Sequence, residues 1–365
     1  MSRSAFSLCA VLATMLVLCA AFAPVLSAPQ ADLSHPQKVS VCQLQKDPPS
    51  FDHKLVEVEA FVSQGFEDFT LFDPQCFIYP EIWLEYGGKV NSGTIYFGPG
   101  TSDRKRPEDL VVQGTPIPLV DDEIFRMFDK RIHTQGPRGH GPITRATLVG
   151  TFFAGRKETY PSGDSAWSGF GHFGCCTLLA IEQVKAVDLR ERPGLDPFVQ
   201  PMPFIDGFLP NNDLWHSLIP ADTSRFILES QRQTDEGSRA WAFDDPKRVA
   251  LDLIEQDLRN LSFDPAMLKE TDKHEGLFEF EAKMPAIGTK YTVTVARPAW
   301  LAFYARNPDR VAWVAIGAMA ERLDKRKPMT GPGQAQSARK KQPVLVGPRP
   351  IPHSSRLPYI QCVKS

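Results

Sequence analysis

The sequence lacks an excess of either charge, and beyond its first thirty residues it lacks any apolar run long enough to span a membrane. Its 41 lysines and arginines nearly balance 43 aspartates and glutamates, which gives a formal net charge of -2 at pH 7. A near-neutral chain has no global positive field to attract nucleic acid or an anionic membrane. We therefore expect no nucleic-acid partner, and no transmembrane segment once an N-terminal leader is removed.

Familiar catalytic motifs are also missing. There is no phosphate-cradling glycine loop, no Gly-x-Ser-x-Gly elbow, no His-Glu-x-x-His helix and no Cys-x-x-Cys pair. Without such a motif, nothing in the sequence marks a nucleophile, a general base or a set of metal ligands. The sequence therefore favours a non-enzymatic protein, with no catalytic residue, no cofactor and no metal assigned.

The first residues have the three-part layout of a secretory signal peptide. Arg3 supplies a positive charge, residues 5–23 are apolar, and Val25 and Ser27 precede a cleavage site after Ser27. A signal peptide over 1–27, followed by a linker over 28–39, predicts a secreted or periplasmic protein. An uncleaved leader that anchors the chain is the alternative, because 5–23 approaches the roughly 20 apolar residues that span a bilayer.

Removal of that leader leaves five cysteines: Cys42, Cys76, Cys175, Cys176 and Cys362. In an oxidising compartment disulfides are the default expectation. Cys42 precedes the first predicted strand and Cys76 follows the second, so a barrel would bring them together at one end of the sheet. We expect a disulfide between them, worth roughly 3 to 4 kcal/mol, with two buried free thiols as the alternative. The pairing of the other three cysteines stays open.

Five segments between residues 40 and 190 alternate between apolar and polar side chains, as half-buried strands do. These segments are 54–62, 68–73, 82–86, 143–153 and 176–184. Between the third and the fourth, apolar residues recur at helical spacing after Asp121 or Asp122, either of which can cap a helix. Gly150 suits a sharp bend where two strands approach closely. The order predicts a five-stranded barrel whose helix closes one end.

Residues 40–190 therefore resemble an OB-fold (oligonucleotide/oligosaccharide-binding-like) domain of exported bacterial proteins of uncharacterised function. The segments that carry the resemblance are VEVEAFV, LFDPQC, IWLEY, ATLVGTFF and LLAIEQV. The departure from that pattern is the long connection from Gly87 to Pro142, with its basic run Arg104-Lys105-Arg106, which could add a hairpin or cover the barrel. The resemblance implies that the loop between the fourth and fifth strands borders the ligand face.

A second region follows a proline-rich linker over 191–214. Its predicted elements are a strand at 224–230, a helix from Pro246 to about Arg259, a hairpin of 277–282 and 291–296, a short helix at 298–306, and a strand or helix at 311–320. They predict a small α+β domain over 215–324, which makes the whole chain mixed α/β (α+β). Residues 325–365 are basic and rich in proline and glycine, which predicts a disordered tail.

The fourth-to-fifth connection, 155–172, is the most suggestive segment for binding. It holds Arg156, Lys157, Tyr160, Trp167, Phe170 and His172 in a glycine-rich frame. Aromatic rings stack on sugar or base faces, and arginine and lysine hold anionic groups. Trp83 could extend this platform if it points outward, as could Phe66. The preferred hypothesis is an exported binding or structural module that presents this loop to a glycan, a peptide or another cell-envelope component, or to the second domain.

Two other functions remain open. A thiol- or metal-dependent enzyme could use His172, Cys175 and Cys176, although adjacent strand residues point to opposite faces and the two thiols are not expected to share an ion. Alternatively, the barrel serves only as a docking scaffold for the C-terminal domain, which predicts that Trp167 is fully buried.

Overall fold

The computed structural model describes residues 35–322, except 66–67, 77–79, 95–103, 137–138, 160–164, 172–173, 201–214, 218–222, 259–262 and 275. The predicted signal peptide and the predicted tail lie outside the described residues. The described residues from Gln37 onward belong to one compact unit. No helix within these ranges is both long enough and apolar enough to cross a membrane.

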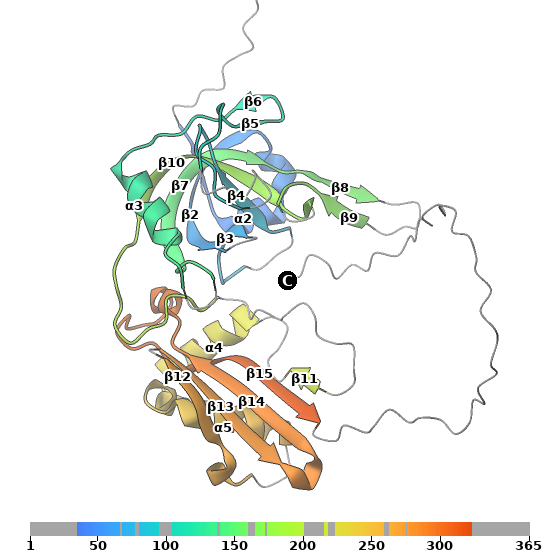
Figure 1. Ribbon diagram of the computed structural model, residues 1–365, viewed down its shortest axis with the longest axis vertical. Coiled ribbons are helices and arrows are strands. Elements are labelled where there is room, and N and C mark those ends of the chain that lie inside the picture. The colour runs from blue at the N-terminus through green and yellow to red at the C-terminus, as the bar shows by residue number, and fades with distance from the viewer. Residues whose placement is uncertain are drawn as a thin grey trace, which may run out of the picture. The chain divides into compact units, whose positions relative to one another are not determined.

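Five strands close into a mixed β-barrel (Figure 1). They are β2 (Lys54–Gln64), β3 (Phe69–Phe72), β4 (Ile82–Tyr86), β7 (Thr144–Phe153) and β10 (Thr177–Val187). β2, β3 and β4 form an antiparallel meander, β4 runs parallel to β10, and β10 pairs with β7, which returns to β2. The short β1 (Gln37–Val39) lies parallel to β2. The predicted closed five-stranded barrel is confirmed.

Every second side chain along the strands points inward, and these side chains fill the barrel. On β2, Val56, Val58 and Val62 are fully buried in its core. The helix α3 (Glu123–Ile132) adds Phe125, Phe128 and Ile132 to the same core. Asp122 begins α3, since its side chain accepts a 2.8 Å hydrogen bond from the backbone N–H of Phe125. A second helix, α2 (Val41–Lys46), begins with a capping box, and η1 (Pro48–Phe51) follows it.

Gly150 on β7 lies opposite Ile181 on the neighbouring antiparallel strand β10. A Cβ atom at this position would overlap the carbonyl oxygen of Ala180. The prediction that two strands approach closely at Gly150 is therefore confirmed.

The long connection after β4 both adds a hairpin and covers the barrel. Its hairpin consists of β5 (Val111–Val112) and β6 (Thr115–Pro116). Leu110, Val112 and Ile117 pack against the outer side of the barrel sheet, where they bury Trp83 and Phe153. The outer side of β4 and β10 is thus a second small core.

A buried ion pair ties this connection to the barrel. Glu85 on β4 is fully buried and lies 2.7 Å from the guanidinium of Arg106. Its carboxylate also accepts hydrogen bonds from the backbone N–H groups of Tyr86 and Ser92 and from the Ser92 hydroxyl. The basic run therefore folds inward, and its Arg104 forms two hydrogen bonds to Asp129 on α3.

The C-terminal part is a five-stranded antiparallel sheet with two helices on it (Figure 1). The strand order is β11 (Trp215–Ser217), β15 (Val314–Arg322), β14 (Thr289–Ala296), β13 (Leu277–Met284) and β12 (Lys269–His274). The helices are α4 (Thr223–Asp235) and α5 (Pro246–Leu258), with short 3-10 turns η3 (Ala240–Phe243), η4 (Pro265–Met267), η5 (Pro285–Ile287) and η6 (Ala299–Phe303). The predicted hairpin and the helix from Pro246 are confirmed.

One predicted strand is wrong. Residues 224–230 belong to the helix α4. Five of its six buried residues are polar, so apolar periodicity could not reveal the helix. The six are Thr223, Ser224, Ile227, Ser230, Gln231 and Thr234. The segment 311–320 contains most of the strand β15, and 298–306 contains only the 3-10 turn η6.

Candidate functional site

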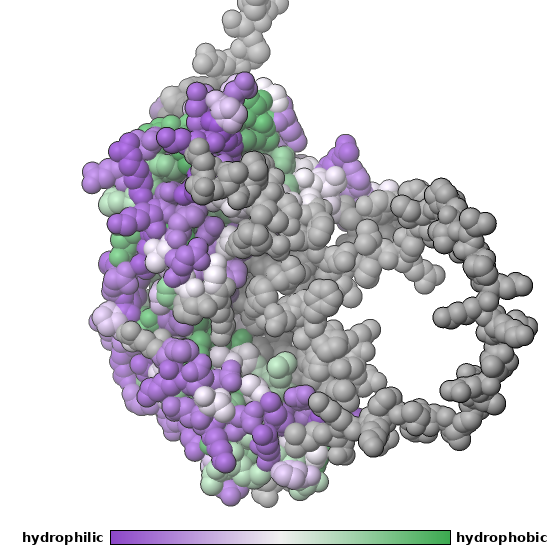
Figure 2. Space-filling view, in the orientation of Figure 1, coloured by the Kyte–Doolittle hydropathy of each residue, from purple (hydrophilic) through white to green (hydrophobic). Residues whose placement is uncertain are grey.

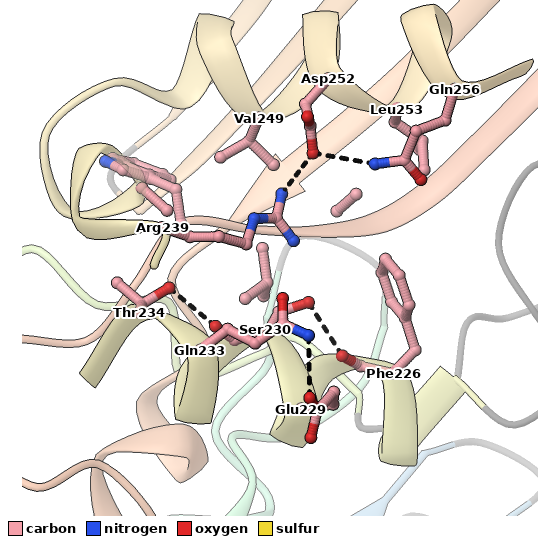
Figure 3. Close-up of a pocket in the computed structure, with 14 residues that line it drawn as sticks. Phe226, Glu229, Ser230, Gln233, Thr234, Arg239, Val249, Asp252, Leu253 and Gln256 are labelled. Atoms are coloured by element: carbon pink, nitrogen blue, oxygen red, sulfur yellow. Dashed lines mark hydrogen bonds and ion pairs between the residues drawn. The ribbon is translucent and has the colours of Figure 1, made fainter. Parts of the chain in front are cut away.

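A cleft of about 250 Å³ opens between α4 and α5 in the C-terminal part (Figure 3). α4 forms one wall, α5 forms the opposite wall, and η3 and the start of β15 complete the lining. The cleft lies where both helices place their buried faces on the sheet and leave a gap between their flanks. Pro246 and the side chain of Asp245, which accepts a hydrogen bond from Arg248, fix where α5 begins.

The wall on α5 carries a hydrogen-bonded ion pair. Arg239 donates from Nη2 to Oδ2 of Asp252 at 2.8 Å, and Gln256 donates to the same oxygen at 3.0 Å. The side chains of Arg239 and Asp252 are 19% and 25% exposed, so the pair is shielded but still reached by solvent. The Arg239 guanidinium also lies over the Trp241 ring, 5.0 Å from its centroid, which restricts its orientation.

The wall on α4 is polar as well. Glu229 accepts two hydrogen bonds from Arg232 and one from Gln233, and these bonds lower the pKa of Glu229 to about 2. Glu229 is therefore ionised at neutral pH and already paired. The hydroxyls of Ser230 and Thr234 donate to backbone carbonyls one turn earlier.

The floor of the cleft is apolar. Val249 and Leu253 from α5 and Trp313 and Val314 at the start of β15 are buried there, and the half-buried Phe226 adds its ring from α4. Figure 3 shows the Phe226 ring beside the opening, with Arg239, Asp252 and Gln256 across from it. An apolar floor with a few convergent polar groups is typical of a small-molecule site.

The sequence-predicted binding loop forms a separate feature. Its β8 (Arg156–Thr159) and β9 (Ser165–Ser168) pair only with each other, and the hairpin projects from the barrel (Figure 1). Lys157 lies opposite Trp167, and Arg156 is paired with Glu158 on its own strand. Trp167 is half-buried, so the full burial expected of a pure docking scaffold is not found.

Among the described platform residues, Trp83 and Phe170 do not join this hairpin in one open surface. Trp83 is 2% exposed and packs in the outer core with Phe153, while the half-buried Phe170 packs against the same cluster. Gly171 lies so close to the Trp83 ring that a Cβ atom there would overlap it. Trp83 is therefore closed to a stacking ligand in this structure. Tyr160, His172 and Phe66 lie outside the described residues.

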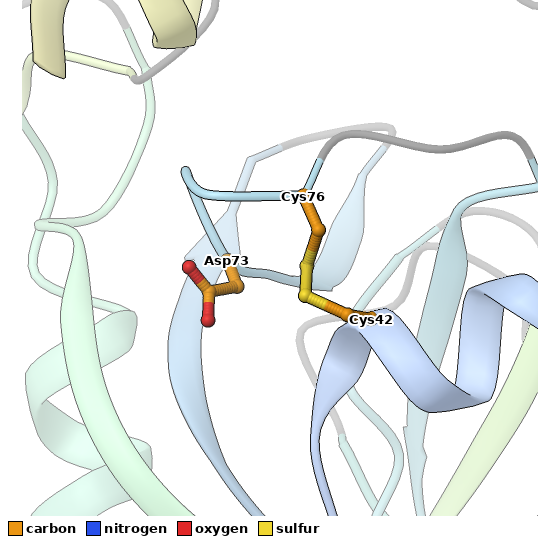
Figure 4. Close-up of side chains that lie close together, drawn as sticks. All are labelled: Cys42, Asp73 and Cys76. Carbon is orange, nitrogen blue, oxygen red and sulfur yellow. A yellow bond between two sulfur atoms is a disulfide. The ribbon is translucent and has the colours of Figure 1, made fainter. Parts of the chain in front are cut away.

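Cys42 and Cys76 form a disulfide, with their Cα atoms 5.4 Å apart (Figure 4). The bridge joins the start of α2 to the turn after β3. The carboxylate of Asp73 lies within 4.8 Å of both sulfur atoms. Because a metal would require the free thiolates, this cluster is not a metal site while the disulfide is intact.

Cys175 and Cys176 are both buried, and their sulfur atoms are joined to each other. Our expectation that the two side chains point to opposite faces is therefore wrong. The reason is that β10 begins only at Thr177, so the two cysteines precede the strand, where Cys176 forms only an isolated β-bridge with Phe170. The structure thus brings these two predicted residues together, with no thiol left free in the described pair.

Sequence reasoning missed the cleft because its lining comes from segments between Phe226 and Ala315. Two signals were available: Glu229 with Gln233, and Asp252 with Gln256, are each four residues apart and therefore share one helix face. Only the recognition of α4 as a helix would have made them meaningful. No family model matches this sequence, and comparison with the curated proteins and with the solved structures finds no similar protein.

Proposed function

We propose that this protein is a non-enzymatic binding protein that holds a small ligand in the cleft between α4 and α5. The observation that carries the proposal is the combination, in one cleft, of an apolar floor and planar polar side chains from both helices. The polar groups are held by mutual hydrogen bonds, which pre-organises them for a ligand. No activated nucleophile is needed for such a function.

In this proposal the barrel supports the C-terminal part without docking through Trp167, which is only half-buried. Phe61, Phe72 and Ile143 of the barrel belong to the same hydrophobic core as the C-terminal sheet. The Phe61 ring meets that of Phe303 at 5.3 Å, and Tyr304 donates a 2.9 Å hydrogen bond to Asp73. These contacts favour a scaffold that supports the C-terminal layer. The strand order and the helix between β4 and β7 also support an OB-like origin for the barrel.

We further propose that the protein acts outside the reducing cytoplasm. The Cys42–Cys76 disulfide supports this, since structural disulfides persist in oxidising compartments. The signal-like leader over 1–27 points the same way.

The test is a small-fragment screen on the purified chain by ligand-observed NMR, repeated on two variants. Gln233→Trp places a large side chain in the cleft from a half-buried position on α4. Lys247→Trp adds the same side chain at an exposed position of α5 that does not line the cleft. Fragments that bind the wild type and Lys247→Trp, but not Gln233→Trp, would support the proposal. Identical binding profiles for both variants would reject it.

A second candidate is the β8–β9 hairpin as an arm that binds a glycan or a peptide. The half-buried indole of Trp167 opposite the exposed Lys157 favours it. In that case the fragments or oligosaccharides that bind would be insensitive to Gln233→Trp and sensitive to Trp167→Ala.

A further inference from the structure

We propose that the ligand of the α4–α5 cleft is a neutral sugar, of which the cleft holds a single ring. This inference rests on the proposed binding function and goes beyond it by assigning the chemical class of the ligand. Three properties of the cleft carry it: its charges are paired internally, its remaining hydrogen-bonding atoms include both donors and acceptors, and its floor is apolar.

The charged side chains that line the cleft are paired within the protein. Arg239 is paired with Asp252 at 2.8 Å, and Glu229 is paired with Arg232. A ligand with a carboxylate or an ammonium group would therefore find no unpaired counter-charge among the described lining residues. Such a ligand would have to displace an existing partner, and a partly buried charge left without its partner is costly. A neutral ligand leaves both ion pairs intact.

The hydrogen-bonding atoms that remain are of both kinds. Within the described part of the chain, Nη1 of Arg239 makes no hydrogen bond and is available as a donor. Oδ1 of Asp252 and the side-chain carbonyl oxygens of Gln233 and Gln256 are likewise unused as acceptors there. A hydroxyl group donates one hydrogen bond and accepts two, so neighbouring hydroxyls on one ring can satisfy this mixed set. Only a ligand with several such groups would use all four positions.

The apolar floor and the volume of the cleft also suit a sugar ring. A pyranose ring presents C–H groups on its faces, which pack against apolar and aromatic side chains such as Phe226 and Leu253. The cleft measures about 250 Å³, below the roughly 300–1,000 Å³ of clefts that hold drug-sized ligands. It therefore suits one ring rather than an extended chain.

The experiment compares sugars of one ring size that differ in charge, by isothermal titration calorimetry on the full chain. The neutral probes are D-glucose, D-galactose and N-acetyl-D-glucosamine, and the charged probes are D-glucuronate and D-glucosamine. We expect at least one neutral probe to bind with a Kd at least tenfold lower than either charged probe. Gln233→Trp should abolish that binding, and Lys247→Trp should retain it.

A variant that removes one charge of the cleft tests whether the Arg239–Asp252 pair sets the preference for a neutral sugar. Asp252→Asn removes the counter-charge of Arg239 and keeps the shape of the side chain. We expect the Kd of D-glucuronate to fall at least tenfold in this variant, because Arg239 is then free to pair with the carboxylate, while the affinity for the neutral probe decreases. If Asp252→Asn bound the neutral and charged sugars in the same order of affinity as the wild type, the pairing of Arg239 with Asp252 would be contradicted.

The outcomes distinguish this inference from the proposed function. If fragments bind in the cleft but no neutral sugar does, or if a charged sugar binds better to the wild type, the sugar assignment is wrong and the binding function stands. If neither fragments nor sugars respond to Gln233→Trp, both proposals fail.

Discussion

The barrel and the C-terminal cleft each contain an arginine–carboxylate pair, and the two pairs differ in what surrounds them. In the barrel, Glu85 is fully buried, forms an ion pair with Arg106, and accepts hydrogen bonds from Ser92 and from the backbone N–H of Tyr86. In the cleft, Arg239 and Asp252 are partly exposed and each keeps an unused hydrogen-bonding atom within the described structure. The first pair is closed to solvent on the side of Glu85, so it serves the fold. Solvent reaches both partners of the second pair, so that pair can also receive a ligand.

The largest expected effect comes from breaking the buried pair. Arg106→Met leaves the Glu85 carboxylate buried without its counter-charge, which should lower the free energy of unfolding by about 3–5 kcal/mol. Arg239→Met in the cleft should cost only about 1 kcal/mol, because solvent reaches that pair. Urea unfolding followed by circular dichroism measures both. Equal losses would contradict the contrast between the two pairs.

Removal of the barrel disulfide should have a slightly smaller effect. Cys42 and Cys76 are 34 residues apart in sequence, and their bridge restricts the unfolded chain. The double variant Cys42→Ala, Cys76→Ala should lose ~3–4 kcal/mol in the chain-entropy account. Chemical unfolding gives the loss, and peptide mapping of the unreduced wild type should recover the two cysteines in one linked peptide. A stability unchanged by the double substitution would show that the bridge does not form in solution.

The buried pair should also make the stability of the barrel depend on pH. Burial raises the pKa of Glu85 above 4.5, and Arg106 and Ser92 only partly oppose this. The folded state therefore binds the proton more tightly than the unfolded state. The contribution of Glu85 to the free energy of unfolding is therefore fully present below pH 4.5. It is lost as pH rises through the higher pKa that Glu85 has in the folded state.

Glu85→Gln removes that titration. The difference in unfolding free energy between wild type and Glu85→Gln should therefore shift against the wild type as pH rises from 4 upward, until Glu85 is ionised in the folded state as well. Unfolding curves over a pH series measure it. A difference that is constant with pH would mean that Glu85 has the same pKa in both states.

The same contrast explains what the sequence could predict. The barrel was predictable because Val56 and Val58 alternate with Glu57 and Glu59, and a period of two specifies a half-buried strand. The cleft was not, because the buried face of α4 includes Ser230, Gln231 and Thr234. Gln231, for example, is buried by accepting a hydrogen bond from the backbone of Ala312, a contact across 81 residues. Tertiary hydrogen bonds of this kind leave no periodic apolar signal.

Trp83 does not extend the predicted binding loop, for a related reason. Trp83 alternates with Ile82 and Leu84, so the pattern correctly sends it to the other side of the sheet. That side is covered by Leu110 and Ile117 from the long connection, which no local pattern relates to β4. The sequence could predict that the Trp83 side chain points away from the barrel core. It could not predict how exposed Trp83 is, because its exposure depends on which other segment of the chain covers it.

The smallest expected effect concerns the β8–β9 hairpin, which belongs to the predicted binding loop. Arg156 and Lys157 are exposed on β8, and the double variant Arg156→Ala, Lys157→Ala should change the free energy of unfolding by no more than about 0.5 kcal/mol. Because the hairpin pairs with no other strand, its loss of charge should also leave sugar affinity in the cleft unchanged. Calorimetry with the neutral probe on this variant measures that. A large loss of affinity with unaltered stability would move the ligand from the cleft to the hairpin, since only direct contact could then connect two surface charges to binding.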